Sequence, residues 1–134
     1  MKILIEQGKI VESRADAAVL FCFEDDLLSD AVWASLGESS RMLIRRMIDG
    51  GDVKGKDKEI HVIYLPESSA IGRIILVGLG KKKEADLERV RGAFALAAGR
   101  ARSLKLRSIA VSPEWCDSGS EAEVVAAAAV EGIE

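Results

Sequence analysis

The chain has 134 residues, of which 49% are hydrophobic and 31% charged, with a formal net charge of −3. A chain of this length buries roughly two thirds of its unfolded surface in one core, which excludes a second full domain. The bulk charge does not select for nucleic acid or for an anionic membrane.

The first half of the chain predicts two strands before any helix. Residues 2–6 (KILIE) and 16–23 (DAAVLFCF) are short β-branched or aromatic runs with polar residues at their ends. Cys22 lies within the second run, where a buried and inert thiol is expected, and two cysteines are too few for a secreted disulfide scaffold. No apolar stretch approaches the roughly 20 residues that span a bilayer. We therefore expect a cytoplasmic protein with no membrane partner.

Two helices are predicted next. Ser29 can cap a short helix that carries Val32 and Leu36 and is broken by Gly37. A second helix is predicted to stop at residues 50–51, which are both glycine. Its apolar stripe consists of Leu43, Ile44, Met47 and Ile48.

The second half predicts a strand, helix and strand arrangement. Residues 59–66 (EIHVIYLP) and 73–80 (RIILVGLG) are nearly continuous apolar runs, typical of strands covered on both faces. Asp86 is placed to cap the helix that follows, and residues 108–112 (SIAVS) form another strand. The helix has an apolar stripe of Leu87, Val90, Phe94, Ala97, Ala101 and Leu104. This pattern predicts an α/β fold with parallel strands.

The C-terminal stretch SGSEAEVVAAAAVEGIE predicts one more helix. Ser120 and Glu123 have the spacing of a capping box, and the alanines favour helix. Because no cationic residue or stop signal follows, we expect the sequence to be a fragment of a longer chain.

The loop after residues 73–78 is the candidate anion-binding site. Gly78 and Gly80 are separated by a single residue, and Lys81 and Lys82 follow them. A P-loop needs four residues between its glycines, and the dinucleotide fingerprint needs a glycine where Lys83 stands. We therefore favour a structural turn over a phosphate cradle.

No catalytic or metal-binding constellation is predicted. His61 is the only histidine and lies within a strand, where a packed ring is expected. The acidic residues 24–26 are expected to be solvated and to favour the helix after them. The basic residues recur in clusters, which we interpret as solvated faces, although they leave duplex contact open.

Residues 73–111 resemble the N-terminal domain of the leucyl aminopeptidase (cytosol aminopeptidase) family, in which a VGLGK segment precedes an amphipathic helix. Residues 16–25 (DAAVLFCFED) resemble the second strand of that domain, and residues 50–66 resemble its GdfkGk segment and the strand after it. Residues 121–134 resemble the start of its linker helix. The resemblance implies one non-catalytic, macro-like domain over residues 1–134, a three-layer mixed sheet flanked by helices, with the linker helix from about residue 120.

The same resemblance implies partners and cofactors outside this chain. They are a C-terminal catalytic domain with two divalent metals, zinc or manganese, that removes N-terminal residues from peptides, and a homo-hexamer of full-length chains. The domain itself is expected to support assembly and access to the active site. Two alternatives remain open: a free-standing macro-like module that binds ADP-ribose between residues 78–83 and the loop after Phe23, and a DNA-binding module, as in some bacterial relatives.

Overall fold

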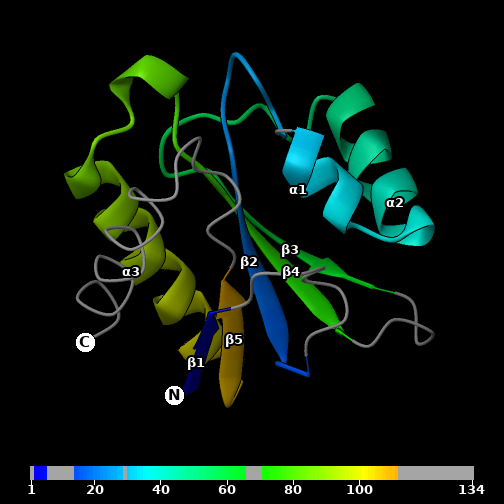
Figure 1. The fold of residues 1–134 in the computed structure, drawn as a ribbon, viewed down its shortest axis with the longest axis vertical. Helices are drawn as coiled ribbons and strands as arrows, with labels where there is room; N and C mark the ends of the chain where they lie inside the picture. Colours follow the sequence, from blue (N-terminus) through cyan, green and yellow to red (C-terminus); the bar gives the residue numbers. More distant parts are fainter. Residues whose placement is uncertain (1, 6–13, 29, 66–70, 112–134) are drawn as a thin grey trace.

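The computed structural model describes residues 2–5, 14–28, 30–65 and 71–111. Five strands form one mixed sheet with helices on both faces, which confirms the predicted three-layer α/β fold (Figure 1). The strands are β1 (Lys2–Ile5), β2 (Ala17–Cys22), β3 (Ile60–Tyr64), β4 (Arg73–Gly78) and β5 (Ser108–Val111). The helices are α1 (Asp30–Ser35), α2 (Glu38–Asp49) and α3 (Leu87–Ser103), with a 3-10 turn, η2 (Lys82–Glu84).

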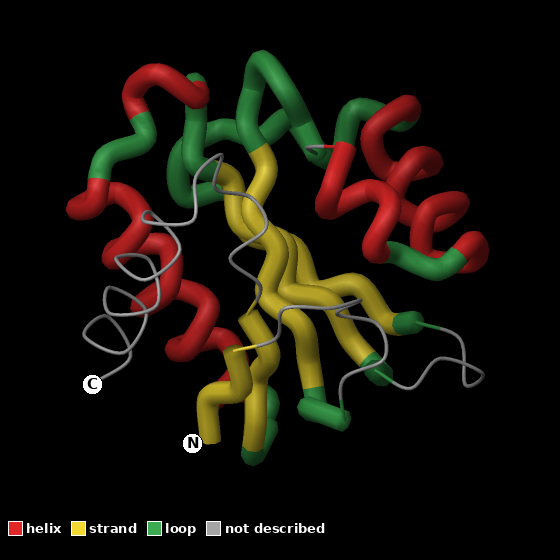
Figure 2. Tube along the Cα trace, viewed as in Figure 1, coloured by secondary structure: helices red, strands yellow, loops and turns green. Residues whose placement is uncertain are grey.

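The sheet has the strand order β1-β5-β2-β4-β3. All neighbouring strands are parallel except β3, which runs antiparallel to β4. Strands β4 and β5 are parallel as predicted, and β2 lies between them. Helices α1 and α2 cover one face of the sheet and α3 covers the other (Figure 2).

The central strand β2 is buried over its whole length, because both of its faces are covered. Val19 and Phe21 belong to the core under α3, whereas Leu20 and Cys22 belong to the core under α1 and α2. The rings of Phe21 and Phe94 meet edge to face, with centroids 4.8 Å apart. A continuous apolar run is therefore the correct sign of a strand covered on both faces.

The same prediction holds only in part for β3, in which Ile63 belongs to the core under α1 and α2 and Ile60 packs against the core under α3. This strand has one neighbour, β4, and Ile63 is its only buried residue among the described ones. Tyr64 is 61% exposed. An apolar run reports hydrophobicity and not position in the sheet, so it does not distinguish an edge strand from a central one.

Helix α3 follows most of its predicted pattern. Asp86 accepts a hydrogen bond from the Arg89 amide at 2.8 Å, which confirms it as the N-cap. Val90 and Phe94 are buried, but Leu87 is 48% exposed. The prediction for Leu87 is wrong, because this residue starts the helix and the buried face of α3 begins at Val90.

Helix α2 begins after Gly37 and ends before Gly50, as predicted. Ile44 is fully buried, and Met47 packs against the same core. The predicted cap Ser29 and the C-terminal helix lie outside the described residues. No helix in the described ranges is long and apolar enough to cross a membrane.

Candidate functional site

Three loops meet beyond the carboxyl ends of β2 and β4, at the upper end of the molecule in Figure 1. They are residues 23–28 after β2, residues 53–59 before β3, and residues 79–86 after β4. The chain leaves β2 toward one face of the sheet and leaves β4 toward the other. In open α/β sheets such a divergence is the usual place for a ligand, and the predicted anion loop at residues 78–82 lies here.

The backbone of the candidate anion loop is bonded to the protein itself. The amide of Gly78 donates to the carbonyl of Glu59 at 2.7 Å, and the amide of Gly80 donates to the carbonyl of Gly55 at 2.9 Å. Between them, the Leu79 amide donates to the Cys22 carbonyl at 2.8 Å. An anion that used these amides would first have to break these bonds.

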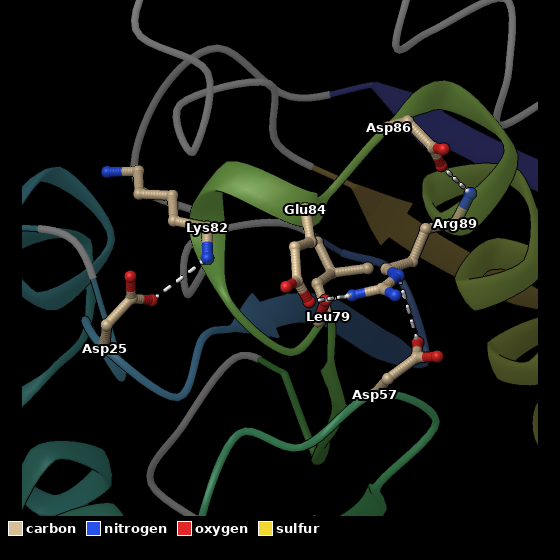
Figure 3. A network of polar contacts seen from close by, with 7 residues as sticks. All are labelled: Asp25, Asp57, Leu79, Lys82, Glu84, Asp86 and Arg89. Carbon is tan, nitrogen blue, oxygen red and sulfur yellow. Dashed lines mark hydrogen bonds and ion pairs between the residues drawn. The ribbon is translucent and has the colours of Figure 1, made fainter.

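Lys82, in the loop after Gly80, is held by the acidic residues after β2. The Lys82 amide donates to Asp25 Oδ1 at 3.0 Å (Figure 3). Lys82 Nζ lies 3.5 Å from Asp26 Oδ2. The ammonium also lies 5.8 Å from the centroid of the Phe23 ring. Anion binding by Gly78, Gly80, Lys81 and Lys82 remains a prediction, with Asp25 and Asp26 as competing anions.

These contacts correct the interpretation of the acidic cluster. Asp25 is exposed but binds the turn at Lys82 instead of supporting α1, which begins five residues later. The hydrogen bond from the Lys82 amide, aided by the charges of Lys82 and Lys81, lowers the pKa of the Asp25 carboxyl. The sequence pattern could not reveal this partner, because 57 residues separate the two groups.

Two glycines allow the loops to approach this closely. A Cβ on Gly78 would lie 2.0 Å from the carbonyl oxygen of Lys56, so only glycine fits beneath this loop. Gly80 has a φ of +77°, in the region that favours glycine, and turns the chain away from the sheet. The glycine pair therefore serves the turn that we favoured from the sequence.

Glu59 fixes the loop that lies above Gly78. Its carboxylate accepts hydrogen bonds from the Lys54 amide at 3.1 Å and from the Gly55 amide at 2.6 Å. His61 Nε2 lies 3.3 Å from Glu59 Oε1. Burial raises the pKa of Glu59, but the two amides and His61 outweigh it, and the pKa falls below its usual value of 4.5. The single histidine thus supports a carboxylate that shapes a loop.

Arg89 lies opposite the apolar stripe in helical spacing, which predicts a solvated side chain, but it joins the loops from the side of α3. Its Nη1 donates to the carbonyl of Leu79 at 3.0 Å and lies 3.8 Å from Glu84 Oε2, while its Nε lies 3.7 Å from Asp57 Oδ1 (Figure 3). The side chain is 27% exposed. Helical spacing gave no signal for this role, because the partners come from two other loops.

The remaining candidates offer no reactive group. Burial, with a smaller contribution from Glu59, raises the pKa of the Cys22 thiol to about 12, so this thiol stays protonated and weakly reactive at neutral pH. Within the described residues, no three His, Cys, Asp or Glu side chains lie together in a way that could hold a metal ion. These residues do not fit a two-metal centre.

Solved macrodomains have the same fold. The chain matches the macrodomain of Mycobacterium tuberculosis DarG with a TM-score of 0.72 at 16% identity, over 97% of this chain and 88% of that one. A mutant of tomato leucine aminopeptidase matches with a TM-score of 0.68 at 23% identity, over 99% of this chain and 27% of that one. The class of fold is therefore macrodomain-like.

Sequence relatives define the family. Residues 19–134 match the cytosol aminopeptidase family, N-terminal domain. A probable cytosol aminopeptidase of Nitratidesulfovibrio vulgaris is 32% identical over 111 residues, 83% of this chain and 22% of that protein. Another, from Roseiflexus castenholzii, is 32% identical over 133 residues, 98% of this chain and 24% of that protein. The chain belongs to the cytosol aminopeptidase family, corresponds to its N-terminal domain, and spans about a quarter of the length of these relatives.

Replacing Gly78 tests the close packing of the loops. We expect Gly78→Ala to lower the free energy of unfolding by about 3 kcal/mol, because the new Cβ would collide with the Lys56 carbonyl. Urea denaturation measures the loss. Gly72→Ala is the matched control, since nothing lies within 4 Å of a Cβ there. Equal effects of the two substitutions would contradict this packing.

The Glu59 carboxylate predicts a pH dependence of stability. Because its folded pKa is lowered, its contribution is present above the unfolded value of about 4.5 and is lost as the pH falls through the folded pKa. The melting temperature of the native chain should therefore drop on acidification more steeply than that of Glu59→Gln. The exposed Glu24→Gln variant is the control, and the two variants should differ. Parallel profiles for the native chain and Glu59→Gln would refute this role.

Proposed function

We propose that this chain serves as the non-catalytic accessory and assembly domain of a metal-dependent aminopeptidase. One observation carries the proposal: residues 19–134 match the N-terminal domain of the cytosol aminopeptidase family, while the chain spans only 22% and 24% of two relatives. Catalysis is assigned to the remaining three quarters of such a protein. The partners are a C-terminal catalytic domain and further copies in a homo-hexamer.

The chemistry of the described residues supports this division of labour. Water activation by two metals needs several converging ligands, and the carboxylates near the loops are engaged with backbone amides and cations. In the proposal, zinc or manganese is held by the catalytic domain, which hydrolyses the N-terminal peptide bond. This domain contributes a rigid body to the assembly.

Nucleotide binding is the weaker candidate. It rests on the likeness to macrodomains, and a fold alone does not carry a function. At the carboxyl ends of β2 and β4, the amides that would receive a phosphate donate to Glu59, Cys22 and Gly55. DNA binding is weaker still, because Lys82 is engaged by Asp25 and Asp26.

The experiment compares the chain alone with a chimera. The chain alone should release no product from leucine p-nitroanilide with manganese or zinc present. Residues 1–134 should restore hexamer mass and hydrolysis when they replace the matching segment of the Roseiflexus castenholzii relative, whereas deletion of that segment should reduce both.

Light scattering gives the mass, and the release of nitroaniline gives the rate. Hydrolysis by the chain alone would overturn the non-catalytic assignment. A deletion variant that matched the chimera in both mass and rate would overturn the accessory and assembly role.

A further inference from the structure

A groove of about 670 Å³ lies at the end of the sheet opposite the three loops. It is formed by the segment before β2, the end of β3, the start of β4 and the turn after α3. Its polar side chains are Arg14, Asp16, Tyr64, Arg73, Lys105 and Arg107. None of these residues belongs to the site described above.

The strand register brings these side chains together. Tyr64 is paired with Arg73 across β3 and β4, and Arg73 is paired with Ala17 across β4 and β2. Ala17 is paired in turn with Ile109 of β5, two residues after Arg107. The cations therefore come from segments distant in sequence and gather along one row at the end of the sheet.

The groove carries excess positive charge in a chain whose net charge is −3. Four cations line it with one carboxylate, Asp16. That carboxylate already accepts hydrogen bonds from the amides of Arg107 at 2.7 Å and Ser108 at 3.3 Å. Within residues 14–28, 30–65 and 71–111, the guanidinium groups of Arg14, Arg73 and Arg107 and the Lys105 ammonium have no carboxylate within ion-pair distance.

The end of α3 does not cancel this charge. The carbonyls of Arg100, Ala101 and Arg102 accept hydrogen bonds from the amides of residues 104–106, which leaves fewer unpaired carbonyls at the negative end of the helix. Lys105 occupies the left-handed region with a φ of 60°, and the turn at this residue exposes its side chain. Leu104 and Leu106 are half-buried and give the groove an apolar floor.

We propose that this groove binds an acidic polypeptide segment that carries apolar residues between its carboxylates. Carboxylates pair well with guanidinium groups, and the leucine floor matches apolar side chains. The Arg73 guanidinium lies 5.1 Å from the centroid of the Tyr64 ring, so a base stacking on that ring face would have to displace it. Because Arg73 occupies this ring face, an acidic peptide fits better than a nucleic acid.

Fluorescence anisotropy tests the proposal on the 134-residue chain. The probe is a fluorescein-labelled hexapeptide of four glutamates and two leucines, compared with its glutamine counterpart and with an oligothymidylate of the same charge. We expect the acidic peptide to bind, its affinity to fall with added salt, and Arg73→Gln with Arg107→Gln to weaken it about tenfold.

Arg45→Gln with Arg46→Gln is the matched control. It removes two arginines from α2, one of which lies over an aromatic ring, Trp33, as Arg73 lies over Tyr64. This control should leave the affinity within about twofold of the native chain.

Circular dichroism checks that each variant folds. If the groove variant does not fold, Lys105→Asn replaces it, because asparagine tolerates the left-handed backbone, and about threefold weaker binding is expected. Equal affinities for the folded groove variant and the control would overturn the proposal. Binding of the glutamine peptide as tight as that of the acidic one, or tighter binding of the oligothymidylate, would also overturn it.

Discussion

The contact between Gly78 and the loop at residues 54–59 is the constraint on which the upper end of this molecule depends. The Lys56 carbonyl occupies the space that a side chain at position 78 would need. Because the loop lies there, the amides of Gly78 and Gly80 find carbonyl partners in Glu59 and Gly55. Arg89 then joins this loop to the segment after β4. The glycine pair, which was also a candidate for a phosphate cradle, thus allows two loops to pack against each other at the carboxyl ends of β2 and β4.

The sequence predicts the elements well because their signals are local. The apolar runs identified β2 and β4, and Asp86 identified the start of α3. The strand order could not be predicted, since a run does not say whether a strand is central or at an edge. The bonds at the loops were equally inaccessible: Asp25 and Lys82 are 57 residues apart, and helical spacing placed Arg89 in solvent.

The two ends of the sheet differ in how their charges are used. At the carboxyl ends of β2 and β4, carboxylates and cations satisfy one another and the backbone between them. At the opposite end, Arg73 and Arg107 line a groove whose one carboxylate serves backbone amides. The macrodomain-like fold therefore has paired charges at the carboxyl ends of β2 and β4 and a basic groove at the opposite end of the sheet.

Amide hydrogen exchange by NMR tests the closed upper end most directly. The amides of Gly78, Leu79, Gly80 and Lys82 donate to protein acceptors, so they should exchange slowly, and saturating ADP-ribose should change neither their rates nor their chemical shifts. Rapid exchange of these four amides, or a change in their rates or chemical shifts on adding ADP-ribose, would contradict the hydrogen bonds that these amides make to the protein. Such a change would mean that the loops open to receive a nucleotide.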